Sequence, residues 1–263
     1  EVHLVVFPEY TIPGQMLPTL RELATETRCT IIAGTHLVTV ELLADPGYVA
    51  CFAGPPPVNH AIAPVVAPDA APVTYQTKLW QTQWEPQLEC GDQVTPFTYR
   101  TLDGQEIKFG VAICIDFLGH RDEAAAVYHG KWSGDNHLLF VTSLTPDDTP
   151  QRFAASALDV YQHFQVPVVY ANIAKHGGSA VFGYGRADGE PLEAGTAMPP
   201  LPPRHEGVCI VELQATTTAI QRPSSLLQLL PARPIAYALI LATSDEPELA
   251  SAAAALLAAP DAV

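Results

Sequence analysis

Cys114 is the residue of this sequence whose position best suits covalent chemistry. It lies in the stretch Val111–Asp116 (VAICID), at the end of an apolar segment that predicts a buried strand. Backbone N–H groups or a nearby cation at such a strand end would lower the pKa of the thiol and make the thiolate available as a nucleophile. The alternative is a small buried hydrophobic residue, which is the common role of a free cysteine. We assign that role to Cys29, Cys51 and Cys209, which lie inside strand patterns.

Two charged residues could assist this thiol. Glu9 directly follows the apolar segment 3–7 and a proline. A partly desolvated carboxylate at this point has a raised pKa, accepts a thiol proton and returns it to a leaving amine. Lys78 follows the strand-like residues 75–77, and its ammonium could stabilise the oxyanion of a tetrahedral intermediate. The alternatives are a carboxylate that favours the start of the helix at Gly14, and a lysine on the surface.

Other polar residues are candidates for supporting roles. Glu85 follows Lys78 by one short loop and could orient its ammonium or the attacking water. His120 and Arg121, shortly after Cys114, could bind a substrate carboxylate, or they could begin a solvated helix. A cysteine–histidine pair is a competing arrangement, and no spacing selects its base. The histidines that could serve are His120, His163 and His176.

Alternating helices and strands are predicted to position these residues. Helices are predicted over residues 14–27, 120–132 and 151–164, where apolar residues recur at helical spacing. Strands are predicted over residues 3–7, 29–33, 48–52, 137–141, 166–171, 179–183 and 207–213, with a hairpin formed by 97–102 and 107–115. Residues 54–72 are rich in proline and alanine and predict an irregular surface segment. This order favours an α/β domain in which two layers of helices enclose β-sheet, with the candidate residues at strand ends.

The length of 263 residues fits one large domain followed by a tail. We predict the domain over residues 1–213. Residues 214–263 are loosely patterned and alanine-rich at their end, and they are predicted to be a tail, a linker or an oligomerisation segment. Because the chain enters an apolar strand directly after Glu1, we also expect an upstream segment.

Composition excludes several classes of protein. Hydrophobic residues make up 48% and charged residues 16% of the chain, which indicates a globular protein. The net charge of -15 and the pI near 4.8 argue against nucleic acid and anionic membranes as partners. The longest apolar runs are too short to cross a bilayer. Five scattered cysteines without CxxC or Cys/His spacing predict no metal site and favour a reducing, cytoplasmic location.

The candidate segments, taken together and in order, resemble the nitrilase superfamily of carbon–nitrogen hydrolases. The resemblance covers most of the chain up to Leu213 and does not extend into the tail. Its motifs are LVVFPE at 4–9, KLWQTQWE at 78–85, GVAICID at 110–116, VVYAN at 168–172, GSAVFG at 178–183, the DG turn at 188–189 and EGVCIVEL at 206–213.

The resemblance implies an α-β-β-α sandwich with a Glu-Lys-Cys triad and no metal or organic cofactor. In it Cys114 is the nucleophile, Glu9 the general base and acid, and Lys78 the stabiliser of the oxyanion. Glu85 is implied as a supporting glutamate, and the backbone N–H of Ile115 as a second oxyanion donor. The thiolate would attack a carbonyl or nitrile carbon, and water would hydrolyse the resulting thioester. Members of this family usually begin with an upstream strand and helix, which we expect to be missing here.

Three functions remain open on the sequence. The first is a cysteine-dependent hydrolase of non-peptide carbon–nitrogen bonds in small amides, carbamoyl compounds or nitriles. The second is an acyltransferase, in which an amine or thiol replaces water in resolving the thioester. The third is a non-catalytic metabolite-binding or scaffolding module of a larger multidomain protein. The apolar tail and the resemblance also favour a homodimer or a higher oligomer.

Overall fold

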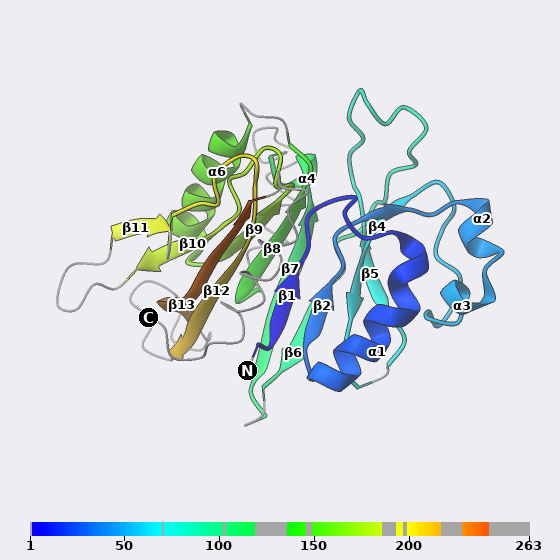
Figure 1. Ribbon diagram of the computed structural model, residues 1–263, viewed down its shortest axis with the longest axis horizontal. Helices are drawn as coiled ribbons and strands as arrows, with labels where there is room; N and C mark the ends of the chain where they lie inside the picture. Colours follow the sequence, from blue (N-terminus) through cyan, green and yellow to red (C-terminus); the bar gives the residue numbers. More distant parts are fainter. Residues whose placement is uncertain are drawn as a thin grey trace.

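Two β-sheets lie between two helical layers in the computed structural model, which describes residues 2–69, 71–101, 104–118, 136–145, 149–185, 193–196, 199–216 and 228–241. Figure 1 shows helix α6 (Pro150–Phe164) on the outer side of one sheet and helix α1 (Leu17–Thr27) on the outer side of the other. The predicted α-β-β-α sandwich is therefore confirmed.

The first sheet is built from the N-terminal part of the chain. Its central strand β4 pairs antiparallel with β2, β3 and β5, and β1 pairs in parallel with β2. The strands are β1 (Leu4–Val6), β2 (Thr30–Ile32), β3 (His36–Leu37), β4 (Ala61–Val66) and β5 (Thr74–Thr77). Glu9 follows β1 by a short connection, and Lys78 directly follows β5.

The second sheet has the order β11-β10-β9-β8-β7-β6. Strands β7, β8 and β9 are parallel to one another, and the remaining pairs are antiparallel. Parallel strands end at the same edge of a sheet, so the ends of β7 and β8 bring Cys114 and Ser143 together. The strands are β6 (Phe97–Arg100), β7 (Glu106–Ile113), β8 (Leu138–Ser143), β9 (Val168–Asn172), β10 (Ala180–Gly185) and β11 (Glu193–Thr196).

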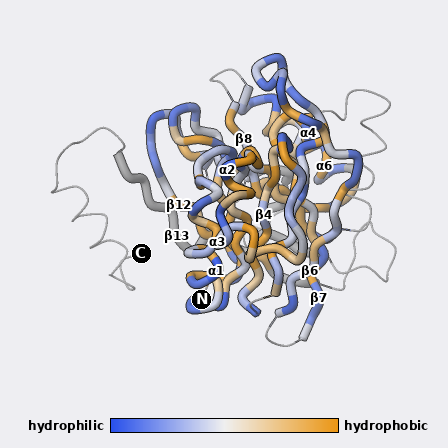
Figure 2. Tube along the Cα trace, turned by 90° about the vertical axis from the view of Figure 1, so that its right-hand side faces the viewer, coloured by the Kyte–Doolittle hydropathy of each residue, from blue (hydrophilic) through white to orange (hydrophobic). Residues whose placement is uncertain are grey.

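Alternation of side chains divides the apolar residues between two cores. In β2, Ile31 packs in the core beneath α1, whereas Ile32 packs in the core shared with the second sheet. Helix α1 contributes Leu17, Leu20 and Ala24 to the first core, at the spacing that places residues on one helical face. Figure 2 shows hydrophobic segments gathered in the interior around β4 and β8. Short helices complete the layers: η1 (Gly14–Met16), α2 (Val40–Leu43), α3 (Pro46–Val49) and α4 (Ile115–Leu118).

A long pair of antiparallel strands lies next to the second sheet. Strand β12 (His205–Thr216) pairs with β13 (Gln228–Leu241), and β13 also contacts β10. The predicted boundary at Leu213 falls inside β12, and residues predicted as a loosely patterned tail include β13. The division of the chain into domains stays a prediction.

Two predicted elements are wrong. The strand expected over 48–52 is replaced by α3 and a turn, because Asp45 Oδ1 accepts hydrogen bonds from the N–H groups of Gly47 and Tyr48 and Pro46 occupies the first helical position. The irregular surface segment expected over 54–72 contains β4, all of which is buried. The helix predicted over 120–132 and the turn at 187–190 lie outside the described residues.

Candidate active site

Glu9 lies between the two sheets with its side chain 2% exposed. Its backbone N–H donates to the carbonyl oxygen of Ser143 at 3.3 Å, which ties the end of β1 to the end of β8. The backbone N–H of Leu144 donates to Glu9 Oε2 at 2.9 Å. One carboxylate oxygen is therefore fixed by the second sheet, and Oε1 is available to other partners.

Lys78 supplies the cation that faces Glu9. Its side chain is 1% exposed, and Nζ donates to Glu9 Oε1 at 2.8 Å. The same nitrogen donates to both carboxylate oxygens of Glu85 at 2.8 Å. One ammonium thus lies between two carboxylates, and its charge and its hydrogens are shared by them.

Glu85 is positioned by more than Lys78. Thr82 donates to Glu85 Oε2 from its backbone N–H at 3.2 Å and from its hydroxyl at 3.0 Å. The hydroxyl of Tyr10, the residue after Glu9, donates to Glu85 Oε1 at 2.9 Å. These contacts hold Glu85 in a fixed orientation toward the ammonium.

Cys114 occupies a sharp turn between β7 and α4. Its φ of 49° is in the left-handed region, a conformation that costs a residue with a Cβ atom about 1–2 kcal/mol. Its backbone N–H donates to the carbonyl oxygen of Thr142 at 2.8 Å, and the Ser143 hydroxyl lies 3.5 Å from Sγ. The Glu9 carboxylate lies close enough to the thiol for each group to affect the pKa of the other. Strained backbone of this kind occurs where a side chain must be aimed at a site.

Burial and opposite charge set the proton affinities of the three groups. Burial raises the pKa of Glu9 above its ordinary value, and Lys78 opposes the rise. Burial, with a further contribution from Glu9, raises the pKa of the Cys114 thiol to about 12. Burial disfavours the charge of Lys78, but Glu9, Cys114 and Glu85 together raise the pKa of its ammonium above the ordinary range. A base with raised proton affinity beside a thiol and a permanent cation suits transfer of the thiol proton to Glu9.

Asp116 links the cysteine turn to the segment after Lys78. The backbone N–H of Leu79 donates to Oδ2, and that of Trp80 donates to Oδ1, both at 2.9 Å. The side chain is 1% exposed, and burial raises the pKa of Asp116 to about 8 although both hydrogen bonds oppose the rise. The sequence motif contains this residue, but its role was not predicted.

The structure brings together the four residues predicted for the chemistry, Glu9, Lys78, Glu85 and Cys114. Ile115, which was predicted to supply a backbone donor, begins α4 next to the thiol, at a helical position whose N–H has no partner within the helix. The predicted substrate residues His120 and Arg121 lie outside the described residues. His120 as a base and the side chain of His163 also lie outside them. Glu9 is the candidate base whose pKa the thiol affects. The contributions of Ser143, Leu144, Asp116 and Tyr10 were missed.

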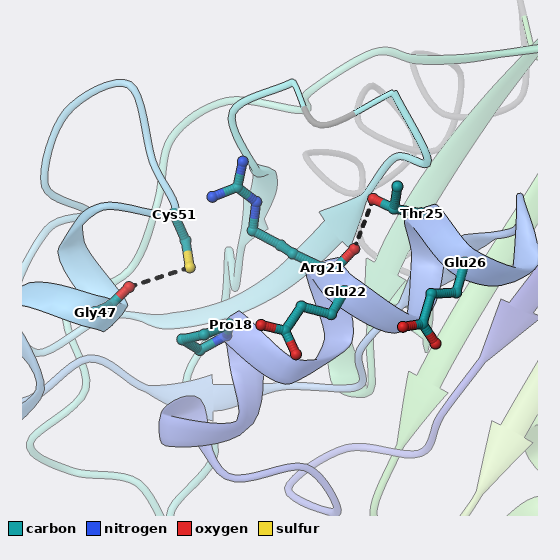
Figure 3. A pocket seen from close by; sticks show the side chains of 7 residues that line it. All are labelled: Pro18, Arg21, Glu22, Thr25, Glu26, Gly47 and Cys51. Atoms are coloured by element: carbon teal, nitrogen blue, oxygen red, sulfur yellow. Dashed lines mark hydrogen bonds between the residues drawn. The ribbon is translucent and has the colours of Figure 1, made fainter.

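The described part of the chain shows neither a metal cluster nor a membrane helix. No group of three or more His, Cys, Asp or Glu side chains in it could bind a metal ion, and no helix in it is long and apolar enough to cross a membrane. A hollow beside α1 is lined by Arg21, Glu22, Glu26 and Cys51 among others (Figure 3). It includes none of the four predicted residues, and its lining mixes both charges.

Comparison with solved structures finds proteins of similar fold, although no family model and no curated protein matches the sequence. Nit3 of Saccharomyces cerevisiae, a member of branch 10 of the nitrilase superfamily, is 19% identical over 68% of this chain and 68% of its own, with a TM-score of 0.46. XC1258 of Xanthomonas campestris, a CN-hydrolase superfamily protein, is 13% identical over 69% and 70%, with a TM-score of 0.48. An amidase of Nesterenkonia is 16% identical over 69% and 70%, with a TM-score of 0.44. All three belong to the nitrilase superfamily. This is the superfamily that the sequence motifs resemble.

Proposed function

We propose that this chain is a cysteine-dependent hydrolase of non-peptide carbon–nitrogen bonds in small amides, carbamoyl compounds or nitriles. The observation that carries the proposal is the position of the Glu9 carboxylate, which lies 2.8 Å from the Lys78 ammonium and close enough to the Cys114 thiol for each of the two groups to affect the other's pKa. All three side chains are buried. A base, a nucleophile and a cation brought together away from water are the components of acyl transfer through a thioester.

For an amide, the first half of the reaction forms the thioester. Glu9 accepts the proton of the Cys114 thiol, and the sulfur attacks the carbonyl carbon. The electron pair of the carbonyl bond moves to its oxygen, and this oxyanion would be stabilised by Lys78 and the backbone N–H of Ile115. Because Nζ has three hydrogens and contacts Glu85 through both carboxylate oxygens, one of these contacts would give way to the oxyanion. Glu9 then protonates the nitrogen as the carbon–nitrogen bond breaks, and the amine leaves.

The second half returns the enzyme to its first state. Glu9 accepts a proton from water, whose oxygen attacks the thioester carbon. The intermediate collapses to the acid, and the sulfur leaves and recovers its proton from Glu9. Partial desolvation suits Glu9 for both directions of transfer, because the raised pKa brings its proton affinity closer to neutral pH.

The proposal is tested with a panel of simple amides, carbamoyl compounds and nitriles. Purified protein, the Cys114→Ala variant and the Cys90→Ala variant are compared for release of ammonia or amine. Cys90 is exposed, so its replacement is a matched control for loss of a thiol outside the site. We expect Cys114→Ala to abolish turnover and Cys90→Ala to leave it unchanged. Equal turnover by Cys114→Ala and the unmodified protein would contradict the proposal.

Product analysis separates hydrolysis from acyl transfer. With an active substrate, hydroxylamine or a small thiol is added in competition with water, and the acyl products are identified by mass spectrometry. Free acid as the dominant product supports a hydrolase. Preferential formation of the hydroxamic acid, or of the thioester of the added thiol, would instead indicate an acyltransferase that uses the same three residues.

A further inference from the structure

Ser143 is the last residue of β8 and lies beside Cys114 because of strand register. Ile113 pairs with Thr142 in the parallel ladder of β7 and β8, so the residues that follow them lie at the same sheet edge. Consecutive strand side chains point to opposite faces. Among the described residues the buried hydroxyl of Thr142 has no hydrogen-bond partner, whereas the hydroxyl of Ser143 lies 3.5 Å from Cys114 Sγ. The ladder thus directs Ser143, and not Thr142, toward the nucleophile.

The hydroxyl of Ser143 differs from the other donors around the sulfur. The Leu144 N–H lies near the sulfur but donates to Glu9 Oε2 at 2.9 Å. The Lys78 ammonium makes contacts of 2.8 Å with three carboxylate oxygens. Both donors are therefore shared with carboxylates. Among the described residues, the Ser143 hydroxyl donates to the sulfur and to no carboxylate.

Two neighbouring hydroxyls support this orientation. The oxygen of Tyr170 on β9 lies 2.8 Å from the hydroxyl oxygen of Thr145. Burial raises the pKa of Tyr170, and the hydroxyls of Thr145 and Ser143 oppose the rise, so both lie near the phenol. With Tyr170 and Thr145 hydrogen bonded to each other, the hydrogen of Ser143 is left for the sulfur. All three side chains are buried.

We propose that Ser143 is a further catalytic residue, which donates a hydrogen bond to the Cys114 thiolate and stabilises it during proton transfer to Glu9. The proposal rests on the proposed function, because it assigns a role only if Cys114 is the nucleophile. A neutral thiol gains little from a hydroxyl donor, whereas a thiolate gains a charge-assisted hydrogen bond. The interaction therefore favours the ionised state that attacks the substrate. Burial raises the pKa of the thiol to about 12, so its thiolate depends on donors of this kind.

The test is the pH dependence of alkylation of Cys114 by iodoacetamide, followed by peptide mass spectrometry. The full chain is compared with Ser143→Ala and with Thr142→Val, which removes a neighbouring buried hydroxyl that has no partner in the part of the chain that the structure describes. We expect Ser143→Ala to slow alkylation about tenfold near neutral pH and to displace the rate profile to higher pH, as loss of one charge-assisted hydrogen bond implies. Thr142→Val should stay within about twofold of the unmodified protein, because the hydroxyl that it removes has no partner to lose.

Thermal unfolding of each variant distinguishes this effect from damage to the fold. A displaced pH profile in a Ser143→Ala protein that unfolds near the normal temperature supports the proposal. An unchanged profile in Ser143→Ala, or an equal displacement in both variants, would overturn it. If the unmodified protein labels Cys114 no faster than Cys90, the proposed function fails instead, and the two failures are thereby separated.

Discussion

The carboxylate of Asp116 accepts both of its hydrogen bonds from the backbone directly after Lys78. Because Asp116 follows Cys114 by two residues, this contact joins the turn of the nucleophile to the segment that carries the cation. The two segments belong to different sheets, and these two hydrogen bonds join them directly. Asp116 therefore acts as a positioning residue for a site that it does not enter.

Replacement of Asp116 by asparagine tests that link. The amide oxygen can still accept from one N–H, but the amide nitrogen then faces the other, so a buried donor loses its acceptor. We expect Asp116→Asn to lower the free energy of unfolding by about 1–3 kcal/mol, measured by urea denaturation. Under conditions in which the variant remains folded, it should also slow alkylation of Cys114 and reduce kcat more than it raises KM. A variant that loses stability but alkylates and turns over normally would limit Asp116 to a structural role.

The hydroxyl of Tyr10 provides a separate test of Glu85. Tyr10→Phe removes the donor 2.9 Å from Glu85 Oε1 and leaves the contacts with Thr82 and Lys78 in place. We expect kcat to fall about threefold to tenfold, since one hydrogen bond to a charged group is lost while others remain. Steady-state kinetics would measure this fall. Tyr75→Phe is the matched control, because the Tyr75 ring packs against Phe52 in the other core. Equal effects of the two changes would contradict a specific role of Tyr10.

The raised pKa of Glu9 predicts the pH below which the rates of alkylation and turnover decrease. Glu9 must be ionised to accept the thiol proton, so both rates should fall as the pH decreases through a pKa above the ordinary 4.5 of a glutamate. In Glu9→Gln this acid limb should disappear. The rate of alkylation should then increase only as the pH approaches the pKa of the thiol itself. This pKa stays above 9.0, because burial, the largest cause of its increase, remains. Rates measured from pH 4 to 10 would test this, and an identical acid limb in Glu9→Gln would exclude Glu9 as the base.

His36 predicts a pH dependence of stability that is unrelated to catalysis. Its Nε2 lies 2.8 Å from the Tyr48 hydroxyl in the core beneath α1, and burial lowers the pKa of His36 from 6.5 to about 4. As the pH falls below 6.5, the unfolded chain binds a proton that the folded chain excludes, so stability decreases, by roughly 3 kcal/mol at pH 4. Urea denaturation at several pH values would measure the slope. His36→Gln should be less stable at pH 7 but should lose less stability between pH 7 and 4, and an unchanged slope would contradict the assignment.

The sequence motifs predicted the three residues that the structure brings together, but not the groups around them. Glu9 was found because it follows an apolar strand, and Lys78 because it follows a strand-like stretch. Ser143 was missed because the strand before it was expected to end at Val141, the last apolar residue, whereas β8 continues through two buried hydroxyl residues. A search for polar residues at the ends of neighbouring parallel strands would have found it. Asp116 was read as part of a motif, but its backbone partners lie 36 and 37 residues away and follow no side-chain pattern.

The proline content of residues 54–72 led to a wrong prediction for the first sheet. Pro64 lies in the middle of β4, although a proline normally argues against a central strand. Its carbonyl oxygen still accepts from the Ala33 N–H at 3.0 Å, so the pairing with β2 continues across it. The composition of 54–72 therefore concealed the strand around which this sheet is organised.

The site is assembled from both halves of the sandwich, and this has a consequence for folding. Glu9 and Lys78 are delivered by the first sheet, and Cys114 and Ser143 by the second, with the Glu9 N–H to Ser143 contact crossing between them. A refolding chain that has formed each sheet but has not docked the two will contain every side chain of the proposed site without the arrangement that the proposed reaction requires. Recovery of a fast-reacting thiol would then report the docking of the two sheets, at a stage when the backbone signal of their strands is already present.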